Sequence, residues 1–429
     1  MGIQILCLNI TLWLITLVIY LKKRKYYDSG AFIISSFLLY SIASLLLFLD
    51  KSGRGSIYTS KEITLLPLVY LFLMILLTTW PVLKYNQKKI SSISSIGTFT
   101  IDCVSYIFIA SVLIQIPEII IHTKSGITQI MATSAGGLDI YNEIMDDSKT
   151  ISKGITNIPS IFINLFSEIA ILIGFYNIAK KRNKKLTIFI FIALFILPFY
   201  HIARAQRGPA VSILLTIFAS YFLFNTFYSE KFKKKALIFI TCIIAILTIP
   251  FIALTLSRFD RGSSTAISSV VSYIGQENLN FDIYAFDNNG LRHGDRVIPL
   301  FKQMVGCENV PENFWERRLK YPFLKINDEV FIGYVGDFLL DFGPLISTII
   351  FIVFTIFFIK KSKPKNGKAT LRNYLVLQFL IVLSIQGGMK LFPFADKAGL
   401  KIIAFILTYI FIGIESFLIK MQNKKELIS

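Results

Sequence analysis

The sequence predicts an all-α polytopic membrane protein. Its mean hydropathy is +0.63, and 54% of its 429 residues are hydrophobic, whereas only 17% are charged. A soluble chain of this length carries more charge. Apolar segments of about 20 residues, the length that crosses a bilayer as a helix, recur from one end of the chain to the other. The first of them, Ile3 to Leu21, is followed by a basic run instead of a small-residue cleavage site, so we interpret it as a retained helix.

About eleven segments are predicted to span the membrane, and one large loop separates the eighth from the ninth. The segments cover residues 3–21, 31–49, 62–83, 98–121, 155–179, 186–203, 208–228, 236–256, 331–359, 371–389 and 400–419. The chain therefore divides into residues 1–256, a long extracytoplasmic loop at 257–330 over the active site, and residues 331–429. Within the ninth segment, Gly343-Pro344 predicts a break, with a pocket-lining or interfacial helix before it and the true span after it.

The net charge of +19 follows the predicted topology and does not indicate a nucleic-acid partner. More than half of the 45 Lys and Arg residues lie in alternate connections between apolar segments. These connections are residues 22–25, 84–89, 180–185, 231–235, 360–372 and the tail from Lys420. Short basic loops stay on the cytoplasmic side of a membrane. The N-terminus is therefore predicted to lie outside and the C-terminus inside.

A motif of two arginines and a glycine, RxxRG, occurs twice. The copies are Arg204-Ala205-Gln206-Arg207-Gly208 and Arg258-Phe259-Asp260-Arg261-Gly262, each after a long apolar segment on the predicted outer side. On a helix, the i, i+3 spacing places both guanidinium groups of a copy on one face. Guanidinium binds phosphate oxygens in a bidentate manner. We interpret the four arginines as a site for the diphosphate of a membrane lipid; contacts with lipid headgroups or nearby acidic residues are the alternative.

A second motif, Arg292-His293-Gly294-Asp295-Arg296, lies in the large loop. Histidine titrates near neutral pH, so His293 is a candidate general base. Arg292 and Arg296 are candidate phosphate ligands, and Asp295 is a candidate acid–base or structural residue. The alternative is that His293 is an ordinary surface residue.

Carboxylates form the third group of candidates. Asp337 and Asp341 are four residues apart, so on a helix they are expected to face an outer vestibule together. Glu168 falls near the middle of the fifth apolar segment, where an ionisable group indicates function, with a structural ion pair as the alternative. The other carboxylates that could deprotonate a sugar hydroxyl are Glu277, Asp282 and Glu329.

Several kinds of site are absent from the sequence. There is no phosphate-binding loop of the GxxxxGK[ST] type and no cytoplasmic DxD-like site for a nucleotide sugar. The four cysteines and three histidines show neither metal-ligand spacing nor a disulfide framework. We therefore expect no metal ion and no other cofactor, and a lipid-linked donor on the outer face fits the sequence better than a cytosolic nucleotide sugar.

The architecture and the motifs together resemble the Wzy oligosaccharide repeat-unit polymerases. The resemblance rests on the number of spans, the large late outer loop, the RxxRG motifs and Asp341-Phe342-Gly343 after that loop. It covers most of the chain as architecture, and its motifs are short. It implies a metal-independent glycosyltransferase of the bacterial inner membrane that builds O-antigen or capsular polysaccharide on the periplasmic face. Its donor and acceptor would be undecaprenyl-diphosphate-linked glycans, and its partners membrane lipids, a flippase and a chain-length regulator.

The resemblance also implies roles for individual residues. In the related O-antigen ligases, outer-face arginines and a loop histidine form the site, which here maps onto the RxxRG arginines and His293. Arg207, Arg261 and His293 would then be catalytic, and Arg204 and Arg258 would bind the diphosphate. Three alternatives stay open: an O-antigen ligase with the same chemistry, a lipid-linked oligosaccharide flippase or other transporter, and a scaffold without catalysis.

Overall fold

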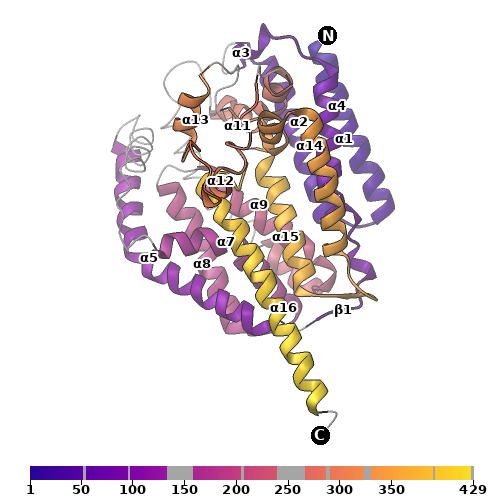
Figure 1. Ribbon diagram of the computed structural model, residues 1–429, viewed down its shortest axis with the longest axis vertical. Coiled ribbons are helices and arrows are strands. Elements are labelled where there is room, and N and C mark those ends of the chain that lie inside the picture. The colour runs from indigo at the N-terminus through magenta and orange to yellow at the C-terminus, as the bar shows by residue number, and fades with distance from the viewer. Residues whose placement is uncertain are drawn as a thin grey trace. The chain divides into compact units, whose positions relative to one another are not determined.

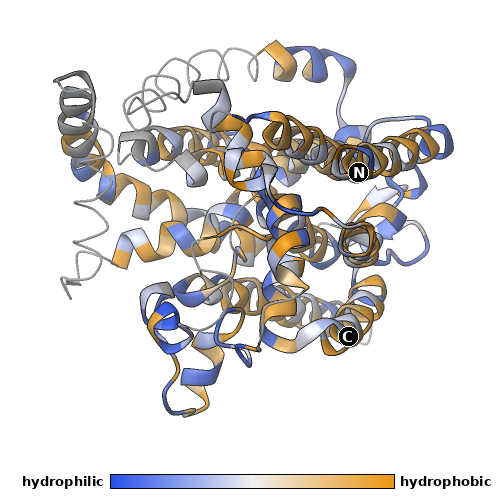
Figure 2. Cartoon of the chain, turned by 90° about the horizontal axis from the view of Figure 1, so that it is seen from above, coloured by the Kyte–Doolittle hydropathy of each residue, from blue (hydrophilic) through white to orange (hydrophobic). Residues whose placement is uncertain are grey.

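The computed structural model describes residues 1–51, 55–94, 97–132, 158–203, 207–238, 266–286, 290–322, 330–389 and 392–426. Long helices form where the sequence is apolar. They are α1 (Gly2–Arg24), α2 (Ser29–Leu49), α4 (Leu65–Lys84), α5 (Thr98–Ala132), α7 (Ile158–Ala179), α8 (Lys184–Ala203), α9 (Arg207–Leu223), α14 (Gly333–Ser362), α15 (Leu371–Gly387) and α16 (Leu400–Glu426) (Figure 1). Hydrophobic residues dominate these helices, and hydrophilic ones gather in the connections (Figure 2).

Seven helices of the described residues are long and apolar enough to cross a membrane, namely α1, α2, α4, α5, α7, α14 and α16. Two shorter apolar helices correspond to α9 and α15. The chain is thus a helical membrane protein by length and composition. The count of eleven spans and the orientation of the chain stay predictions, since the eighth predicted segment, 236–256, lies mostly outside the described residues.

Short elements connect the long helices. They are α3 (Ser56–Thr59), η1 (Gln87–Lys89), β1 (Ser92–Ile93), η3 (Asn225–Phe227), α11 (Ala266–Asn280), η4 (Phe281–Ala285), α12 (Pro299–Met304), α13 (Phe314–Lys320), β2 (Lys368–Ala369) and η5 (Asp396–Gly399). Residues 230–238 are also helical. Strands β1 and β2 pair as a two-stranded sheet.

The chain forms two compact units, each assembled from segments that are distant in the sequence. Unit 1 comprises Met1–Ser92 and Val270–Leu407, and unit 2 comprises Ile93–Ser269 and Thr408–Ser429. In unit 1, α1 packs against α2, and α14 packs against α4 and α15. In unit 2, α5 packs against α7 and α8, and α7 and α8 pack against α9.

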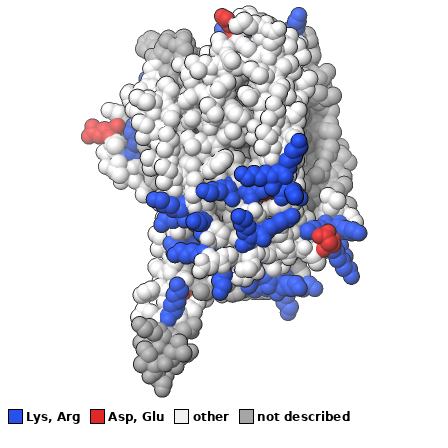
Figure 3. Space-filling model, turned by 90° about the vertical axis from the view of Figure 1, so that its right-hand side faces the viewer, with Lys and Arg blue, Asp and Glu red and all other residues white. Residues whose placement is uncertain are grey.

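Basic residues mark one end of the unit 1 helices. Helices α1, α4 and α14 end there and α2 and α15 begin there, since Arg24 donates to the Leu83 carbonyl and the Ser91 amide donates to the Gly367 carbonyl. The basic residues of these connections are Lys22, Lys23, Arg24, Lys25, Lys84, Lys88, Lys89, Lys360, Lys361, Lys363, Lys365 and Lys368. Figure 3, a view of one side of the molecule, shows Lys and Arg side chains gathered in a band across its lower half. Such clustering is typical of the cytoplasmic ends of membrane helices.

Helix α11 occupies part of the stretch for which the sequence predicts a loop. It packs closely against α2: the Ser44 hydroxyl donates to the Gly275 carbonyl at 2.7 Å. A β-carbon at Gly275 would lie 2.5 Å from the Ala43 backbone, so only glycine permits this approach. Hydropathy does not reveal α11 because several of its residues are small and polar, and small residues allow helices to approach each other closely.

Candidate functional site

Helix α14 breaks at Gly343, as the sequence predicts. Gly343 has φ 73° and ψ 170°, a conformation that L-amino acids with side chains rarely adopt, and Pro344 follows it. Asp337 and Asp341 lie on the segment before the break and share one face, also as predicted. That face is not an open vestibule, however, because both carboxylates have an exposed fraction of 0%. The loop at 291–297 covers them.

The loop at 291–297 is held by its backbone on the broken end of α14. The Arg292 amide donates to the Leu340 carbonyl at 2.9 Å, and the His293 amide donates to the Asp341 carbonyl at 3.0 Å. The last carbonyls before a helix break lack partners within the helix. The loop therefore supplies donors to carbonyls that the Gly343 break would leave without them.

The Asp341 carboxylate adds two further bonds to the same loop. It accepts from the Arg296 amide at 3.1 Å and from the Val297 amide at 2.7 Å. A buried carboxylate needs such donors, and hydrogen bonds to a charged acceptor are stronger than those between neutral groups. Backbone bonds thus fix the loop both before and after Gly294, whose φ of 88° allows the tight turn.

A buried ion pair joins the loop to α14. The Arg296 Nε donates to the Asp337 Oδ1 at 2.5 Å, and both side chains are almost fully buried. The second carboxylate oxygen of Asp337 accepts from the Phe392 amide at 2.6 Å. Arg296 also donates to the Val330 carbonyl at 3.2 Å. We call Arg296, Asp337 and Asp341, with these bonds, the clamp.

The Asp295 carboxylate also has its partners within the protein. Its carboxylate accepts from Lys302, from Lys320 at 2.6 Å and from the Tyr321 hydroxyl at 2.7 Å. Burial by itself raises the pKa of Asp295, but the hydrogen bonds from these three side chains outweigh it and hold the pKa below its ordinary value. The charge of Asp295 therefore binds α12, α13 and the following residue into one folded loop.

His293 is the exposed ionisable residue of the motif. Arg292, Asp295 and Arg296 have exposed fractions of 2% or less, whereas the His293 side chain is exposed. Its φ of 52° lies in the left-handed region, and its amide is bonded to α14. A fixed backbone with an accessible imidazole suits a general base. The guanidinium of Arg292 instead lies 5.9 Å from the centre of the Tyr321 ring.

The structure describes no arginine side chain of the RxxRG motifs, and three of these four residues lie outside the described parts of the chain. These three are Arg204, Arg258 and Arg261, and Arg207 begins α9 but its side chain is not described. The diphosphate site stays a prediction for these four residues. Arg292 and Arg296 are buried, so as they stand they do not present a surface to a ligand.

Glu168 is buried near the middle of α7. Its exposed fraction is 4%, and the Ser167 hydroxyl donates to its carboxylate at 2.9 Å. It belongs to unit 2, whereas His293 and the clamp belong to unit 1. Its role as an acid, a base or a structural residue stays a prediction.

Glu277 is more unusual than the sequence indicates. It lies on α11 with an exposed fraction of 1%, and neither carboxylate oxygen has a hydrogen-bond partner among the described residues. Burial, and to a lesser extent the charge of Asp337, raises the pKa of Glu277 well above its ordinary value. A β-carbon at Gly333 would lie 1.9 Å from its Oε1, so the glycine leaves room for the carboxyl group. Sequence reasoning placed Glu277 in a loop and missed this burial because α11 is weakly apolar.

The described residues contain no group of three or more His, Cys, Asp or Glu side chains that could hold a metal ion. In the comparisons with known proteins, no family model, no curated protein and no solved structure matches the chain.

Proposed function

We propose that the protein is a glycosyltransferase that polymerises undecaprenyl-diphosphate-linked oligosaccharide repeat units into O-antigen or capsular polysaccharide. The observation that supports this proposal best is the loop at 291–297, which presents an exposed His293 on a backbone fixed to α14. The resemblance of the sequence to the Wzy polymerases supplies the reaction and the substrates.

The position of the loop along α14 fits an outer-face active site. Seventeen positions separate Gly343, where α14 breaks, from Lys360, which corresponds to a helix rise of roughly 26 Å. This length is close to the thickness of the bilayer's hydrocarbon core, about 30 Å. If the basic end of unit 1 faces the cytoplasm, His293 lies on the periplasmic side of the bacterial inner membrane.

In the proposed reaction, His293 takes the proton of the acceptor hydroxyl. The hydroxyl oxygen attacks the anomeric carbon of the donor glycan, and the bond from that carbon to the diphosphate oxygen breaks. Undecaprenyl diphosphate leaves with the bonding electron pair. Arg204, Arg207, Arg258 and Arg261 stabilise the negative charge that grows on the diphosphate, and losing one such group costs on the order of 10²-fold in rate.

The clamp has a positioning role in this proposal. Arg296, Asp337 and Asp341 do not touch the sugars; they hold the backbone that carries His293. Asp295, with Lys302 and Lys320, keeps α12 and α13 folded against the same turn. Displacing a base by about 1 Å can lower the reaction rate on the order of 10²-fold. The hydrogen bonds to this loop would therefore support catalysis by keeping His293 in position.

Reconstitution tests the proposal. The purified full chain is supplied with a lipid-linked repeat unit, and the products are separated by size. We expect a ladder of glycans from the wild type and a loss of at least 10²-fold for His293→Ala, Arg207→Ala and Arg261→Ala at normal protein levels. Glu308→Ala, which changes another exposed residue of the large loop at 257–330, serves as the control and should polymerise normally.

The products also separate the alternatives. Transfer of a single unit to lipid A core without a ladder would identify a ligase. Movement of the lipid-linked unit across the membrane without a new glycosidic bond would identify a flippase. Full-length glycan from both arginine variants would contradict the diphosphate site, and full activity of His293→Ala would contradict the base.

A further inference from the structure

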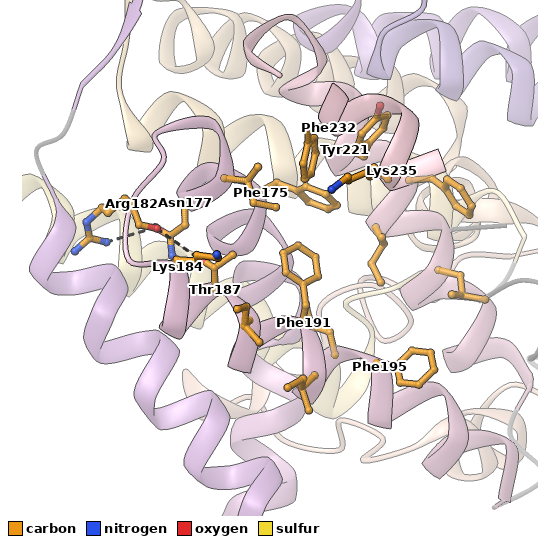
Figure 4. A pocket seen from close by; sticks show the side chains of 18 of the residues that line it. Phe175, Asn177, Arg182, Lys184, Thr187, Phe191, Phe195, Tyr221, Phe232 and Lys235 are labelled. Carbon is orange, nitrogen blue, oxygen red and sulfur yellow. Dashed lines mark hydrogen bonds between the residues drawn. The ribbon is translucent and has the colours of Figure 1, made fainter. Parts of the chain in front are cut away.

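Unit 2 contains a cavity of about 900 Å³ between α7, α8, α9 and the helix at 230–238. Figure 4 shows the rings of Phe175, Phe191, Phe195, Tyr221 and Phe232 around it. This volume is at the upper end of the roughly 300–1,000 Å³ typical of pockets that enclose a small-molecule ligand. The cavity therefore has room for a hydrocarbon chain, and its largely apolar wall suits such a chain.

The cavity reaches the apolar surface of the protein. Ile188 and Ile192 of α8 both line it, and they are 49% and 51% exposed. On a membrane protein, half-exposed isoleucines on a helix of this kind contact the lipid chains of the bilayer. A lipid can thus enter the cavity sideways without passing through water.

Three lysines line the same cavity at the ends of its helices. Lys181 lies in the connection between α7 and α8, Lys184 begins α8, and Lys235 comes from the helix at 230–238. All three are exposed, and none of their side chains forms a hydrogen bond or an ion pair with the described residues. Figure 4 shows Lys235 beside the rings of Tyr221 and Phe232, and Lys184 apart from them, beside Thr187.

Neighbouring basic residues, in contrast to these three lysines, have partners within the protein. Arg182 pairs with Asp102, and Lys233 pairs with Glu230 at 2.7 Å. Lys180 donates to the Ile93 carbonyl at 2.9 Å. The basic residues with internal partners are thus distinct from the three lysines that surround the cavity, which leaves those three positive charges available to a ligand.

We propose that this cavity binds an anionic phospholipid of the bilayer. An acyl chain occupies the aromatic interior, and the phosphate of the headgroup lies between Lys181, Lys184 and Lys235. Basic pockets between membrane helices bind anionic lipid headgroups through this combination of charge and apolar surface. A soluble anion would not need the apolar interior, and a zwitterionic lipid would not need three lysines. The site does not depend on the glycosyltransferase activity.

Lipid titration of the delipidated full chain in detergent tests this, with bound lipid counted by native mass spectrometry. Phosphatidylglycerol is compared with phosphatidylethanolamine carrying the same acyl chains. We expect phosphatidylglycerol to bind at least about tenfold more tightly. The triple variant Lys181→Gln, Lys184→Gln, Lys235→Gln should lose on the order of 10²-fold in affinity for it, at roughly fivefold per lysine. Ala236→Phe, which fills the cavity, should weaken the binding of both lipids.

A matched triple variant controls for general surface charge. Lys185, Lys231 and Lys234 belong to the same two basic segments and are exposed, but they do not line the cavity. Changing them to Gln should alter the affinity by less than about twofold. Equal losses in the two triple variants would overturn the proposal. So would displacement of the lipid by millimolar inorganic phosphate, or tighter binding of undecaprenyl phosphate at the same site.

Discussion

The clamp of unit 1 and the lysine-lined cavity of unit 2 use charge in opposite ways. Arg296, Asp337 and Asp341 are buried, and each has its partners within the protein. Lys181, Lys184 and Lys235 are exposed and have no such partner among the described residues. A buried, paired charge fixes a backbone, whereas an exposed, unpaired charge beside an apolar cavity is available to a ligand. Charged motifs in this chain therefore differ in role according to burial and partner.

The largest expected effect comes from breaking the buried ion pair. Asp337→Ala leaves the Arg296 guanidinium buried without its carboxylate, and removing one partner of a buried pair costs about 3–5 kcal/mol. Denaturant unfolding in detergent measures the loss, and limited proteolysis reports release of the loop at 291–297. A double variant, Asp337→Ala with Arg296→Met, should recover part of the stability, because it removes both charges of the pair. Unchanged stability of Asp337→Ala would show that the clamp does not hold the fold.

Asp341→Asn should have a smaller effect, of about 1–3 kcal/mol. The amide oxygen of Asn can still accept from the Arg296 and Val297 amides, but the stronger bonds to a charged acceptor are lost. The same unfolding experiment measures it, with Glu308→Gln as an exposed control. If His293 depends on the loop geometry, polymer formation should fall in this variant even where the protein remains folded. Normal activity with lowered stability would separate the clamp from catalysis.

The pH dependence of stability tests the burial of Glu277, which lies on α11 outside the candidate spans. Because its pKa is raised, the folded protein keeps a proton that the unfolded chain releases above the ordinary value of 4.5. The contribution of protonated Glu277 to the free energy of unfolding is therefore fully present below pH 4.5. It is lost as the pH rises from 4.5 toward the pKa of Glu277 in the folded protein. Glu277→Gln should flatten the curve of melting temperature against pH over this window. An identical slope in wild type and variant would mean that Glu277 is charged in the folded protein.

The smallest expected effect on stability belongs to the cavity lysines. Without added lipid, the triple variant Lys181→Gln, Lys184→Gln, Lys235→Gln should unfold within about 0.5 kcal/mol of the wild type, because no hydrogen bond or ion pair of these side chains is lost. Denaturant unfolding in the same detergent compares the stability of this variant with that of Asp337→Ala. A loss near that of Asp337→Ala would show that the lysines have structural partners and would remove the contrast between the two regions.

The fold was partly predictable because hydropathy and backbone chemistry are properties of short windows. The apolar segments predicted most of the long helices, and Gly343-Pro344 predicted the break in α14. The i, i+4 spacing predicted that Asp337 and Asp341 share a face. Helix α11 was not predictable in this way, because its small polar residues lower its hydropathy while they let it pack closely against α2.

The candidate site was predictable as a set of residues but not as an arrangement. The motif at 292–296 contains three charged residues besides His293, and nothing in their spacing shows that all three are buried while the histidine is exposed. Likewise, Glu277 and Gly333 are separated by more than 50 residues, so the room that the glycine leaves for the carboxyl group has no local signal.

The sequence by itself determined that this chain forms apolar helices, where one of them breaks, and which connections are basic. Each of these follows from residues that are neighbours in the chain. Only the tertiary structure decided that Arg296 meets Asp337 across 41 positions, and that α7, α8, α9 and the helix at 230–238 enclose a cavity beside unpaired lysines. The physical reason is that burial and pairing depend on which distant segments pack together, and the same lysine or arginine has different chemistry in each case.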